Sequence, residues 1–264
     1  SVFVYDTTAP MAMCQDITIN LNAIGEASIT AADINNGSTD NCSIDSMNAS
    51  MTEFTCADTG ANTVTLTVID PSGNTSTCTS TVTVVDAMAP NAICQDIIVY
   101  LDSTGNVSID SSDVDNGSSD NCGILTMTLS TSTFNCTNIG GNTVTLTVTD
   151  VNGNVSTCTS TVTVVDNINP TAVCKNDTVY LDASGSVSIT TTNVDGGSSD
   201  NCSFTMAISQ STFGCTDTGV NYVTLSVTDS SGNLSTCVAS VFVYDTTAPM
   251  AMCQDITINL NAIG

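Results

Sequence analysis

Hydrophobic and polar residues alternate along long stretches of this chain, a pattern that predicts β-strands. Residues 143–148 read Thr-Val-Thr-Leu-Thr-Val, so the three aliphatic side chains share one face of a strand and the threonines share the other. A second alternating segment, which contains Val162 and Val164, follows the turn sequence at residues 150–154. Together the two segments predict a β-hairpin with one buried face.

Further short alternating segments precede this hairpin. Residues 97–101 and 107–109 flank a turn, and residues 124–130 provide another strand. About seven strands fit into each stretch of about 80 residues, and short strands separated by regular turns are typical of an immunoglobulin-like β-sandwich. The sequence therefore predicts an all-β protein made of immunoglobulin-like sandwich modules in a linear array.

The same pattern occurs three times along the chain. Cysteines recur with spacings of 80, 80 and 79 residues, and residues 1–25 are identical to residues 240–264. This periodicity indicates tandem modules. The predicted modules are residues 7–86, 87–166 and 167–245, with the last strand of a preceding module at residues 1–6 and the first strand of a following module at residues 246–264. We expect one period of a longer polypeptide or of a polymer, and the sequence leaves both open.

The charge balance excludes several classes of function. The chain has 26 acidic residues against a single basic one, Lys175, and no His, so its net charge is −25. Nucleic acids and anionic membrane surfaces bind clustered Lys and Arg, so neither is an expected partner. No apolar run is long enough to predict membrane insertion. Because imidazole groups are absent, most acid–base and nucleophile pairs cannot be assembled, and we expect no enzymatic activity.

Four cysteines in each complete repeat indicate disulfides and an oxidising, extracellular location. A zinc site is the alternative, but the chain contains no Cys-x-x-Cys and no His. Three connectivities are possible within a repeat. We expect the first cysteine to pair with the fourth and the second with the third, and Cys253 to pair beyond residue 264. The expected outer pairs are Cys14–Cys78, Cys94–Cys158 and Cys174–Cys237, and the expected inner pairs are Cys42–Cys56, Cys122–Cys136 and Cys202–Cys215.

Asp residues recur in three loops of every repeat, at the junction between repeats, in the middle of the repeat and in the last hairpin. In an antiparallel sandwich all three loops reach the N-terminal pole, where their carboxylates would form an oxygen cluster suited to Ca²⁺. The alternative is that Asp and Asn occur here because turns favour them. The scarcity of compensating bases favours calcium as a cofactor. The candidate ligands are Asp6, Asp40, Asp70, Asp86, Asp115, Asp120, Asp150, Asp166, Asp195, Asp200 and Asp229.

Paired carboxylates are also the catalytic groups of glycosidases, which is the remaining enzymatic alternative. Such an enzyme needs one specialised cleft, whereas these Asp residues recur at every junction without an aromatic platform for a sugar. We therefore expect the carboxylates to bind an ion, and we assign no catalytic residue.

Several short motifs occur in the same order in each repeat. The second repeat has an Asp-x-x-x-Pro junction at residues 86–90, Ser-Asp-Asn-Cys at 119–122, Thr-Asp-Val-Asn-Gly-Asn at 149–154 and Ser-Thr-Cys at 156–158 before a Val-rich strand. This order resembles hyalin-repeat modules and the tandem repeats of large surface adhesins from gliding, Bacteroidota-type bacteria. The resemblance implies an extracellular, immunoglobulin-like protein with an adhesive or fibrous role, and it names no catalytic residue.

One face of the third repeat differs from its counterparts. Tyr222, Phe242 and Tyr244 replace smaller residues there, and the strand parity places all three on the outer face. We expect a lateral contact at this face, between copies of the chain in a fibre or with a partner.

These features predict a non-enzymatic structural protein, located outside the cell or on its surface. Its disulfide-stapled modules would be stiffened by Ca²⁺ into a stalk or filament, and its main partner would be itself. The alternative is a cell-surface adhesin whose repeats bind glycans or other cells directly. An adhesin should bind a surface through isolated modules, whereas a filament should show lateral self-contacts.

Overall fold

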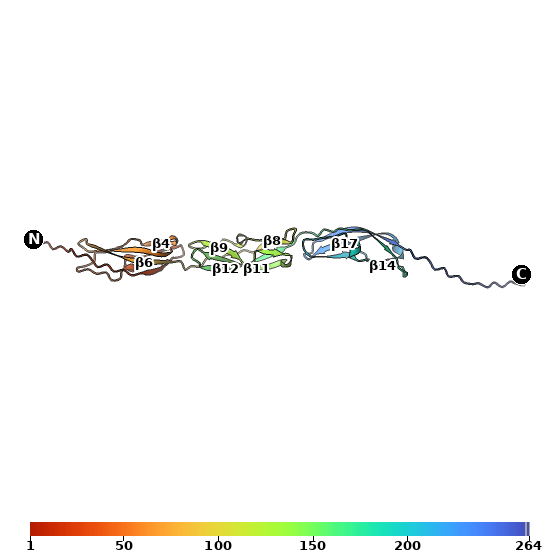
Figure 1. The fold of residues 1–264 in the computed structure, drawn as a ribbon, viewed down its shortest axis with the longest axis horizontal. Helices are drawn as coiled ribbons and strands as arrows, with labels where there is room; N and C mark the ends of the chain where they lie inside the picture. Colours follow the sequence, from red (N-terminus) through yellow and green to blue (C-terminus); the bar gives the residue numbers. More distant parts are fainter. Residues whose placement is uncertain (262, 264) are drawn as a thin grey trace. The chain divides into compact units, whose positions relative to one another are not determined.

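The computed structural model describes residues 1–261 and 263. Strands carry most of the regular structure, as Figure 1 shows, and the helices are short. The chain folds into two compact units, one made of residues 1–98, 108–133 and 141–163 and the other of residues 99–107, 134–140 and 164–264. The division between the units falls inside the second repeat.

Each repeat contributes strands, a one-turn α-helix and a short 3-10 helix (η). The first repeat has β1 (Ile17–Asn20), β2 (Glu26–Ser28), α1 (Ala31–Ile34), β3 (Ser46–Ala49), β4 (Glu53–Thr55), η1 (Cys56–Asp58), β5 (Gly60–Ile69) and β6 (Thr75–Val85). The second has β7 (Ile97–Tyr100), β8 (Asn106–Ser108), α2 (Ser111–Val114), β9 (Ile124–Leu129), β10 (Thr133–Asn135), η2 (Cys136–Asn138), β11 (Gly140–Asp150) and β12 (Val155–Val165). The third has β13 (Asp177–Tyr180), β14 (Ser186–Ser188), α3 (Thr191–Val194), β15 (Phe204–Ile208), β16 (Thr212–Gly214), η3 (Cys215–Asp217), β17 (Gly219–Asp229) and β18 (Leu234–Tyr244). No helix in the described part of the chain combines the length and the apolar character that a membrane crossing requires.

The strands of each repeat form two sheets. In the first repeat the larger sheet has the order β1-β6-β5-β3, with β1 parallel to β6 and the other pairs antiparallel, and β2 pairs with β4 in the second sheet. The other repeats have the same order, β7-β12-β11-β9 with β8-β10 and β13-β18-β17-β15 with β14-β16. The set β3-β5-β6 corresponds to the C, F and G strands of an immunoglobulin sandwich. The predicted fold class, tandem immunoglobulin-like sandwiches, is confirmed.

Each repeat has six strands rather than about seven, and the segment that forms β3 and β4 is divided between the two sheets. β3 starts beside the β5–β6 hairpin, where Ser46 pairs with Ile69. β4 ends beside the turn that follows β1, where Thr55 pairs with Glu26. Only residues 50–52 separate β3 from β4, so the chain keeps its direction while it crosses from one sheet to the other. The start of β3 and the end of β4 therefore lie at opposite poles of the sandwich.

The alternation in the sequence becomes the core of each sandwich. In β5, Val64, Leu66 and Val68 are fully buried and pack with Val82 and Val84 of β6, while the intervening threonines are partly exposed. β17 and β18 supply the equivalent core of the third repeat. The inward positions predicted for the second repeat are also buried, namely Val144, Leu146, Val148, Val162 and Val164. Aliphatic rows of the larger sheet, packed in the first repeat with Ile34 of α1 and Phe54 of β4, thus stabilise the sandwiches without Trp.

The prediction that the two end segments are strands of a preceding and a following module stays a prediction. Residues 1–6 and the described part of residues 246–264 have no strand structure and are almost wholly exposed. A strand needs a neighbouring strand to satisfy its backbone N–H and C=O groups, and these segments pair with none. Ala262 and Gly264, which belong to the second predicted strand segment, lie outside the described residues.

Candidate metal centre at the repeat junction

Asp150 organises the hairpin between β11 and β12. Its Oδ1 accepts hydrogen bonds from the backbone N–H groups of Asn152 and Asn154 at 2.9 and 2.8 Å. Its Oδ2 accepts one from the Asn154 side chain at 2.7 Å. Burial acts to raise the pKa of the Asp150 carboxyl, but these hydrogen bonds outweigh burial and hold the pKa below its usual value. The side chain therefore remains a carboxylate although it is fully buried.

Asn154 also ties this hairpin to the junction segment before the second repeat. Its Nδ2 donates a hydrogen bond to the backbone carbonyl of Asp86 at 3.1 Å. Asp86 is 5% exposed, and its Oδ1 accepts a hydrogen bond from the N–H of Met88 at 3.1 Å. The other carboxylate oxygen of Asp86, Oδ2, is buried and has no donor. The junction thus holds one bare, buried carboxylate oxygen.

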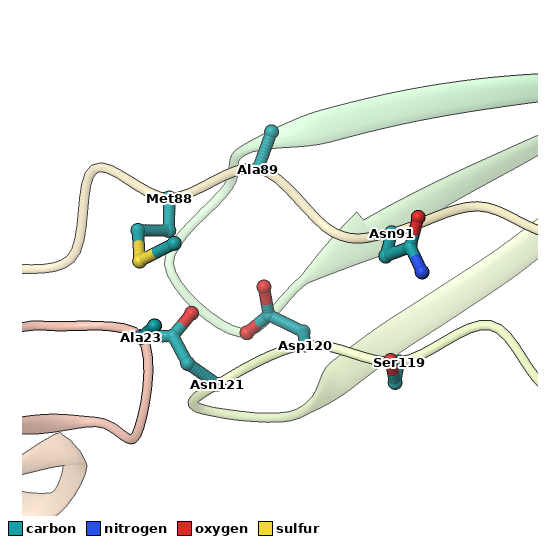
Figure 2. A pocket seen from close by; sticks show the side chains of 7 residues that line it. All are labelled: Ala23, Met88, Ala89, Asn91, Ser119, Asp120 and Asn121. Atoms are coloured by element: carbon teal, nitrogen blue, oxygen red, sulfur yellow. The ribbon is translucent and has the colours of Figure 1, made fainter.

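The loop before β9 brings in a third carboxylate. Asp120 Oδ2 accepts hydrogen bonds from the N–H groups of Cys122 and Gly123 at 2.8 and 3.1 Å, while Asp120 Oδ1 is buried without a donor. Asn121 Nδ2 donates to Asp86 Oδ1 at 3.2 Å, and Asn121 Oδ1 is also buried without a partner. Figure 2 shows Asp120 and Asn121 on this loop, opposite the junction segment that carries Met88 and Ala89. These residues line a hollow of about 250 Å³.

Asp86, Asp120 and Asp150 each place a carboxylate oxygen within 4.8 Å of the other two. Two ionised carboxylates at this separation repel by roughly 3–4 kcal/mol at an effective dielectric constant of about 20. The one basic side chain of the protein, Lys175, lies beside Asp195 in the third repeat. Carboxylate and amide oxygens are the ligands that Ca²⁺ takes in proteins, and the buried oxygens of this cluster that accept no hydrogen bond fit such an ion.

The same arrangement recurs at the start of the third repeat. Asp166, Asp200 and Asp229 bring carboxylate oxygens within 4.8 Å of one another. Asp166 Oδ2 and Asp200 Oδ1 are buried without donors, as in the second repeat. Asn233 Nδ2 joins the hairpin to the junction by donating to the backbone carbonyl of Asp166 at 3.1 Å. The cluster is therefore a repeated feature of the junctions.

The first repeat has a different version of the cluster. Asp6, Asp40 and the Cys42 thiol lie within the same 4.8 Å limit. The hydrogen bond to Asp6 and the charge of that carboxylate raise the pKa of the Cys42 thiol. Asp70, a predicted ligand, is 2% exposed and accepts a hydrogen bond from the Asn74 side chain at 2.7 Å, but it lies outside this group.

Two further predicted ligands lie outside the clusters, and the prediction is corrected for them. Asp115 accepts hydrogen bonds from Ser118, and Asp195 accepts one from Ser198. These bonds hold the pKa of both carboxyls below the usual value. Both side chains close their own loops after the short helices, so for these two residues the turn preference of Asp is the better interpretation.

The asparagines at the junctions have a role that was not predicted from the sequence. Asn121 Nδ2 donates to the backbone carbonyl of Asn22 in the preceding repeat at 3.3 Å, and Asn201 Nδ2 does the same to Asp102 at 3.3 Å. Each asparagine thus contacts the repeat before it and the junction carboxylate of its own repeat. The available signal was the recurrence of Asp-Asn-Cys in every copy.

Each repeat has one internal disulfide, which joins the segment before its first strand to its last strand. These bridges are Cys14–Cys78, Cys94–Cys158 and Cys174–Cys237, with Cα–Cα distances of 5.8, 5.7 and 5.8 Å. They are the outer pairs expected from the sequence. Cys42, Cys215 and Cys253 are free and exposed.

The expected inner pairs are not formed, and bridges between consecutive repeats replace them. Cys56 bonds to Cys122 and Cys136 bonds to Cys202, with Cα–Cα distances of 5.3 and 5.6 Å. The cause is the strand that changes sheets, because Cys42 precedes β3 at one pole and Cys56 follows β4 at the opposite pole. The predicted inner pairs, Cys42–Cys56, Cys122–Cys136 and Cys202–Cys215, are therefore wrong. Adjacent repeats are consequently joined twice, by the peptide chain and by a disulfide.

Gly105 lies against the second of these bridges. Its φ is +74°, and a Cβ there would lie 2.6 Å from Cys136 Sγ and 2.7 Å from the Asn201 carbonyl oxygen. Gly105→Ala is expected to destabilise the protein by about 2–3 kcal/mol and to speed reduction of the Cys136–Cys202 bridge. Calorimetric unfolding and thiol-trapping kinetics measure both effects. Gly117→Ala is the matched control, since Gly117 has φ +88° with no atom within 4 Å of a Cβ, and equal effects of the two variants would contradict the prediction.

No protein-family model matches this chain, and no curated protein matches it. Among solved structures, the chain is similar to an I-band fragment from titin, with a TM-score of 0.44 and 11% identity over 90% of this chain and 100% of that one. It is similar to Sidekick-1 immunoglobulin domains 1–5, with a TM-score of 0.40 and 8% identity over 91% of this chain and 60% of that one. It is also similar to extracellular cadherin domains 1–4 of protocadherin gamma B7, with a TM-score of 0.31 and 14% identity over 77% and 66% of the two chains. These likenesses concern the tandem β-sandwich fold alone, and they give no support to the resemblance with hyalin repeats or Bacteroidota adhesins.

Proposed function

We propose that this chain is a non-enzymatic, extracellular structural protein whose repeat junctions bind Ca²⁺ and thereby stiffen a stalk or filament. Five disulfides favour an oxidising, extracellular location. The carboxylate clusters recur at successive junctions. This distribution suits a structural ion at each junction better than a single catalytic cleft.

The calcium proposal is carried by buried carboxylate oxygens that have no donor. Asp86 Oδ2 and Asp120 Oδ1 in the second repeat are in this state, and so are Asp166 Oδ2 and Asp200 Oδ1 in the third. A buried charged oxygen without a donor or counter-ion is costly, and a bound cation removes that cost. Because the other oxygen of each side chain is hydrogen-bonded within its loop, one oxygen of each remains available to an ion.

An ion held by Asp86, Asp120 and Asp150 would clamp three segments together. These are the junction segment, the loop before β9 and the β11–β12 hairpin. Asn121 extends the clamp to the preceding repeat through its hydrogen bond to the Asn22 carbonyl. Loss of the ion would leave three repelling carboxylates where the peptide enters the repeat. Ca²⁺ is therefore proposed to control the rigidity of the junction.

Removal of Ca²⁺ is expected to increase bending at the junctions and to lower the thermal unfolding midpoint. Isothermal titration calorimetry should detect two strong sites, one for each three-carboxylate cluster. Small-angle scattering with Ca²⁺ and with a chelator measures the change in flexibility. Mg²⁺ is the control and should bind more weakly, because it requires a nearly octahedral site and gives up its waters reluctantly. Identical scattering in both conditions, together with no binding heat, would contradict the calcium proposal.

A second proposal concerns the outer face of the third repeat. Tyr222 and Tyr244 are 73% and 51% exposed. Tyr244 stacks on Tyr180 of β13, with ring centroids 5.9 Å apart, and Phe242 of β18 pairs with the exposed Val220 of β17. Tyr180 and Val220 thus extend the apolar face beyond the three predicted residues. We propose that this face makes lateral contacts between copies of the chain.

Replacing Tyr222, Phe242 and Tyr244 by the second-repeat residues at those positions is expected to weaken lateral self-association by at least about tenfold, because large aromatics contribute most to such contacts. The replacements are Tyr222→Thr, Phe242→Thr and Tyr244→Val. Sedimentation velocity at several concentrations measures the association. Tyr100→Thr, which removes an exposed tyrosine from β7, is the control. Unchanged self-association combined with loss of glycan or cell binding would favour the adhesin alternative instead.

A further inference from the structure

Cys42 and Cys215 are free and exposed, yet each occupies a position that is bridged elsewhere in the chain. Cys42 is the counterpart of Cys122, which is bonded to the preceding repeat. Cys215 is the counterpart of Cys136, which is bonded to the following repeat. Each free cysteine therefore occupies a position that in another repeat holds one half of a bridge between repeats.

The period of the sequence places these two halves in register. Both bridges between repeats span 66 residues. Residues 240–264 repeat residues 1–25 without a change, which defines a period of 239 residues. If the sequence continues with that period, the counterpart of Cys42 follows Cys215 at a distance of 66 residues, the same separation as in the two observed bridges.

The exit pole of the third repeat already has the local geometry of a bridged junction. Cys215 Sγ lies 3.7 Å from the Gly185 carbonyl oxygen, and Cys136 Sγ lies 3.7 Å from the Gly105 carbonyl oxygen. A Cβ at Gly185 would lie 2.7 Å from Cys215 Sγ, so the close approach seen at Gly105 is reproduced. The additional neighbour of Cys136 is the Asn201 carbonyl oxygen of the next repeat, at 3.4 Å.

The loop that carries Cys42 has the same internal bonds as the bridged loop. Asp40 Oδ2 accepts a hydrogen bond from the N–H of Cys42 at 2.8 Å, as Asp120 Oδ2 does from Cys122 at 2.8 Å. Asn41 Nδ2 donates to Asp6 Oδ1 at 3.4 Å. The loop is thus preorganised, so a bridge at Cys42 needs little rearrangement.

A groove at the exit pole of the third repeat matches this loop. Residues 182–185, Cys215 and residues 247–250 line it. At the preceding junction the carbonyl of Asp102, the counterpart of Asp182, accepts a hydrogen bond from an Asp-Asn-Cys loop. The carbonyl of Asp182 is therefore the matching acceptor for Asn41.

We propose that Cys215 forms a disulfide with Cys42 of a second copy of this sequence, which continues the 239-residue period along the same polypeptide, so that every repeat is bridged to the next. The inference rests on the proposed function as a structural array of repeats linked by disulfides, and it does not depend on the proposed Ca²⁺ sites. The reaction joins the two sulfur atoms by thiol–disulfide exchange with a low-molecular-weight disulfide. The S–S bond of that disulfide breaks, and its two sulfurs take up the two electrons and the two protons and leave as two thiols.

The test uses a polypeptide in which residues 1–239 are followed by residues 1–264, oxidised in a glutathione buffer. The new-junction variant carries Cys42→Ser in the first copy and Cys215→Ser in the second. Of the four Cys42 and Cys215 thiols it keeps only the two that face the new junction. Peptide mapping should find Cys215 linked to Cys42, and thiol titration should find one free thiol, that of Cys253.

The chain-end variant is the matched control, with Cys215→Ser in the first copy and Cys42→Ser in the second. Its remaining Cys42 and Cys215 thiols lie at opposite ends of the tandem chain, so it should keep three free thiols. Three free thiols in the new-junction variant would overturn the inference, and so would equal bridging in both variants. If Cys56–Cys122 forms while the new bridge does not, the inference fails alone, whereas loss of both bridges refutes the array of disulfide-linked repeats itself. The result should be the same with Ca²⁺ and with a chelator.

Discussion

Replacing Asp86 and Asp120 by Asn is expected to abolish strong Ca²⁺ binding at the first junction and to make the Ca²⁺-free protein more stable. Asn keeps an oxygen for the loop hydrogen bonds and puts an uncharged amide where each bare oxygen lies. Affinity should fall by at least roughly 100-fold, because two of three charged ligands are lost. Without Ca²⁺ the free energy of unfolding should rise by on the order of 2 kcal/mol, because carboxylate repulsion is removed. Calcium calorimetry and thermal unfolding with and without the ion measure the two effects.

The opposite signs of these effects separate an ion site from a set of turn-forming residues. The control variant, Asp45→Asn with Glu53→Gln, removes the same charge from exposed positions outside the clusters and should leave both quantities nearly unchanged. The intact cluster that begins with Asp166 serves as an internal reference, so the stoichiometry should fall by one site. A variant that is destabilised without Ca²⁺ would indicate that Asp86 and Asp120 only shape their loops.

Removing the bridge between the first two repeats with Cys56→Ser and Cys122→Ser is expected to cost about 4 kcal/mol, the loop-closure value for a 66-residue loop. The two sandwiches should keep their cores, since those depend on aliphatic residues of β5 and β6. The junction, however, should lose one of its two covalent connections and bend more freely. Thermal unfolding measures the first effect, and small-angle scattering measures the second.

Cys42→Ser is the matched control for the bridge variant, because Cys42 is free in this chain. It should leave the stability and the Cys56–Cys122 bridge unchanged. Peptide mapping under non-reducing conditions checks the pairing directly. Release of a Cys56 thiol in the Cys42→Ser variant would mean that the pairing within the repeat is the correct one.

The buried face of each long strand can be read from the sequence, because period-two alternation corresponds directly to the two faces of a strand. Val144, Leu146 and Val148 share one parity and are fully buried. The local pattern is sufficient here, because the alternation within one strand determines which of its side chains point into the core.

The inner disulfides could not be read from the sequence, because they depend on which strands pair. Cys42 and Cys56 are 14 residues apart, a spacing that suits a hairpin as well as a strand that continues in one direction. The pairing of Ser46 with Ile69 in one sheet and of Thr55 in the other decides between them. These are non-local contacts, and no local motif records them.

The candidate metal centre could be predicted from the sequence only in part. The meeting of Asp86, Asp120 and Asp150 can be anticipated from antiparallel topology, which brings three loops to one pole. Which Asp of a loop faces the junction cannot be anticipated, because loops lack a fixed side-chain period. Asp115 therefore looked equivalent to Asp120 in the sequence, although it serves only its own turn.

The internal bridges change how the chain carries a pulling force. Force passes from Cys14 directly to Cys78 and from Cys94 directly to Cys158, and between these bridges residues 78–94 share the load with the Cys56–Cys122 bridge. Each bridge holds back 64 residues, or roughly 200 Å of contour at about 3.4 Å per residue. The oxidised protein is therefore an inextensible tether even when a sandwich melts, and reduction turns it into one that lengthens under load.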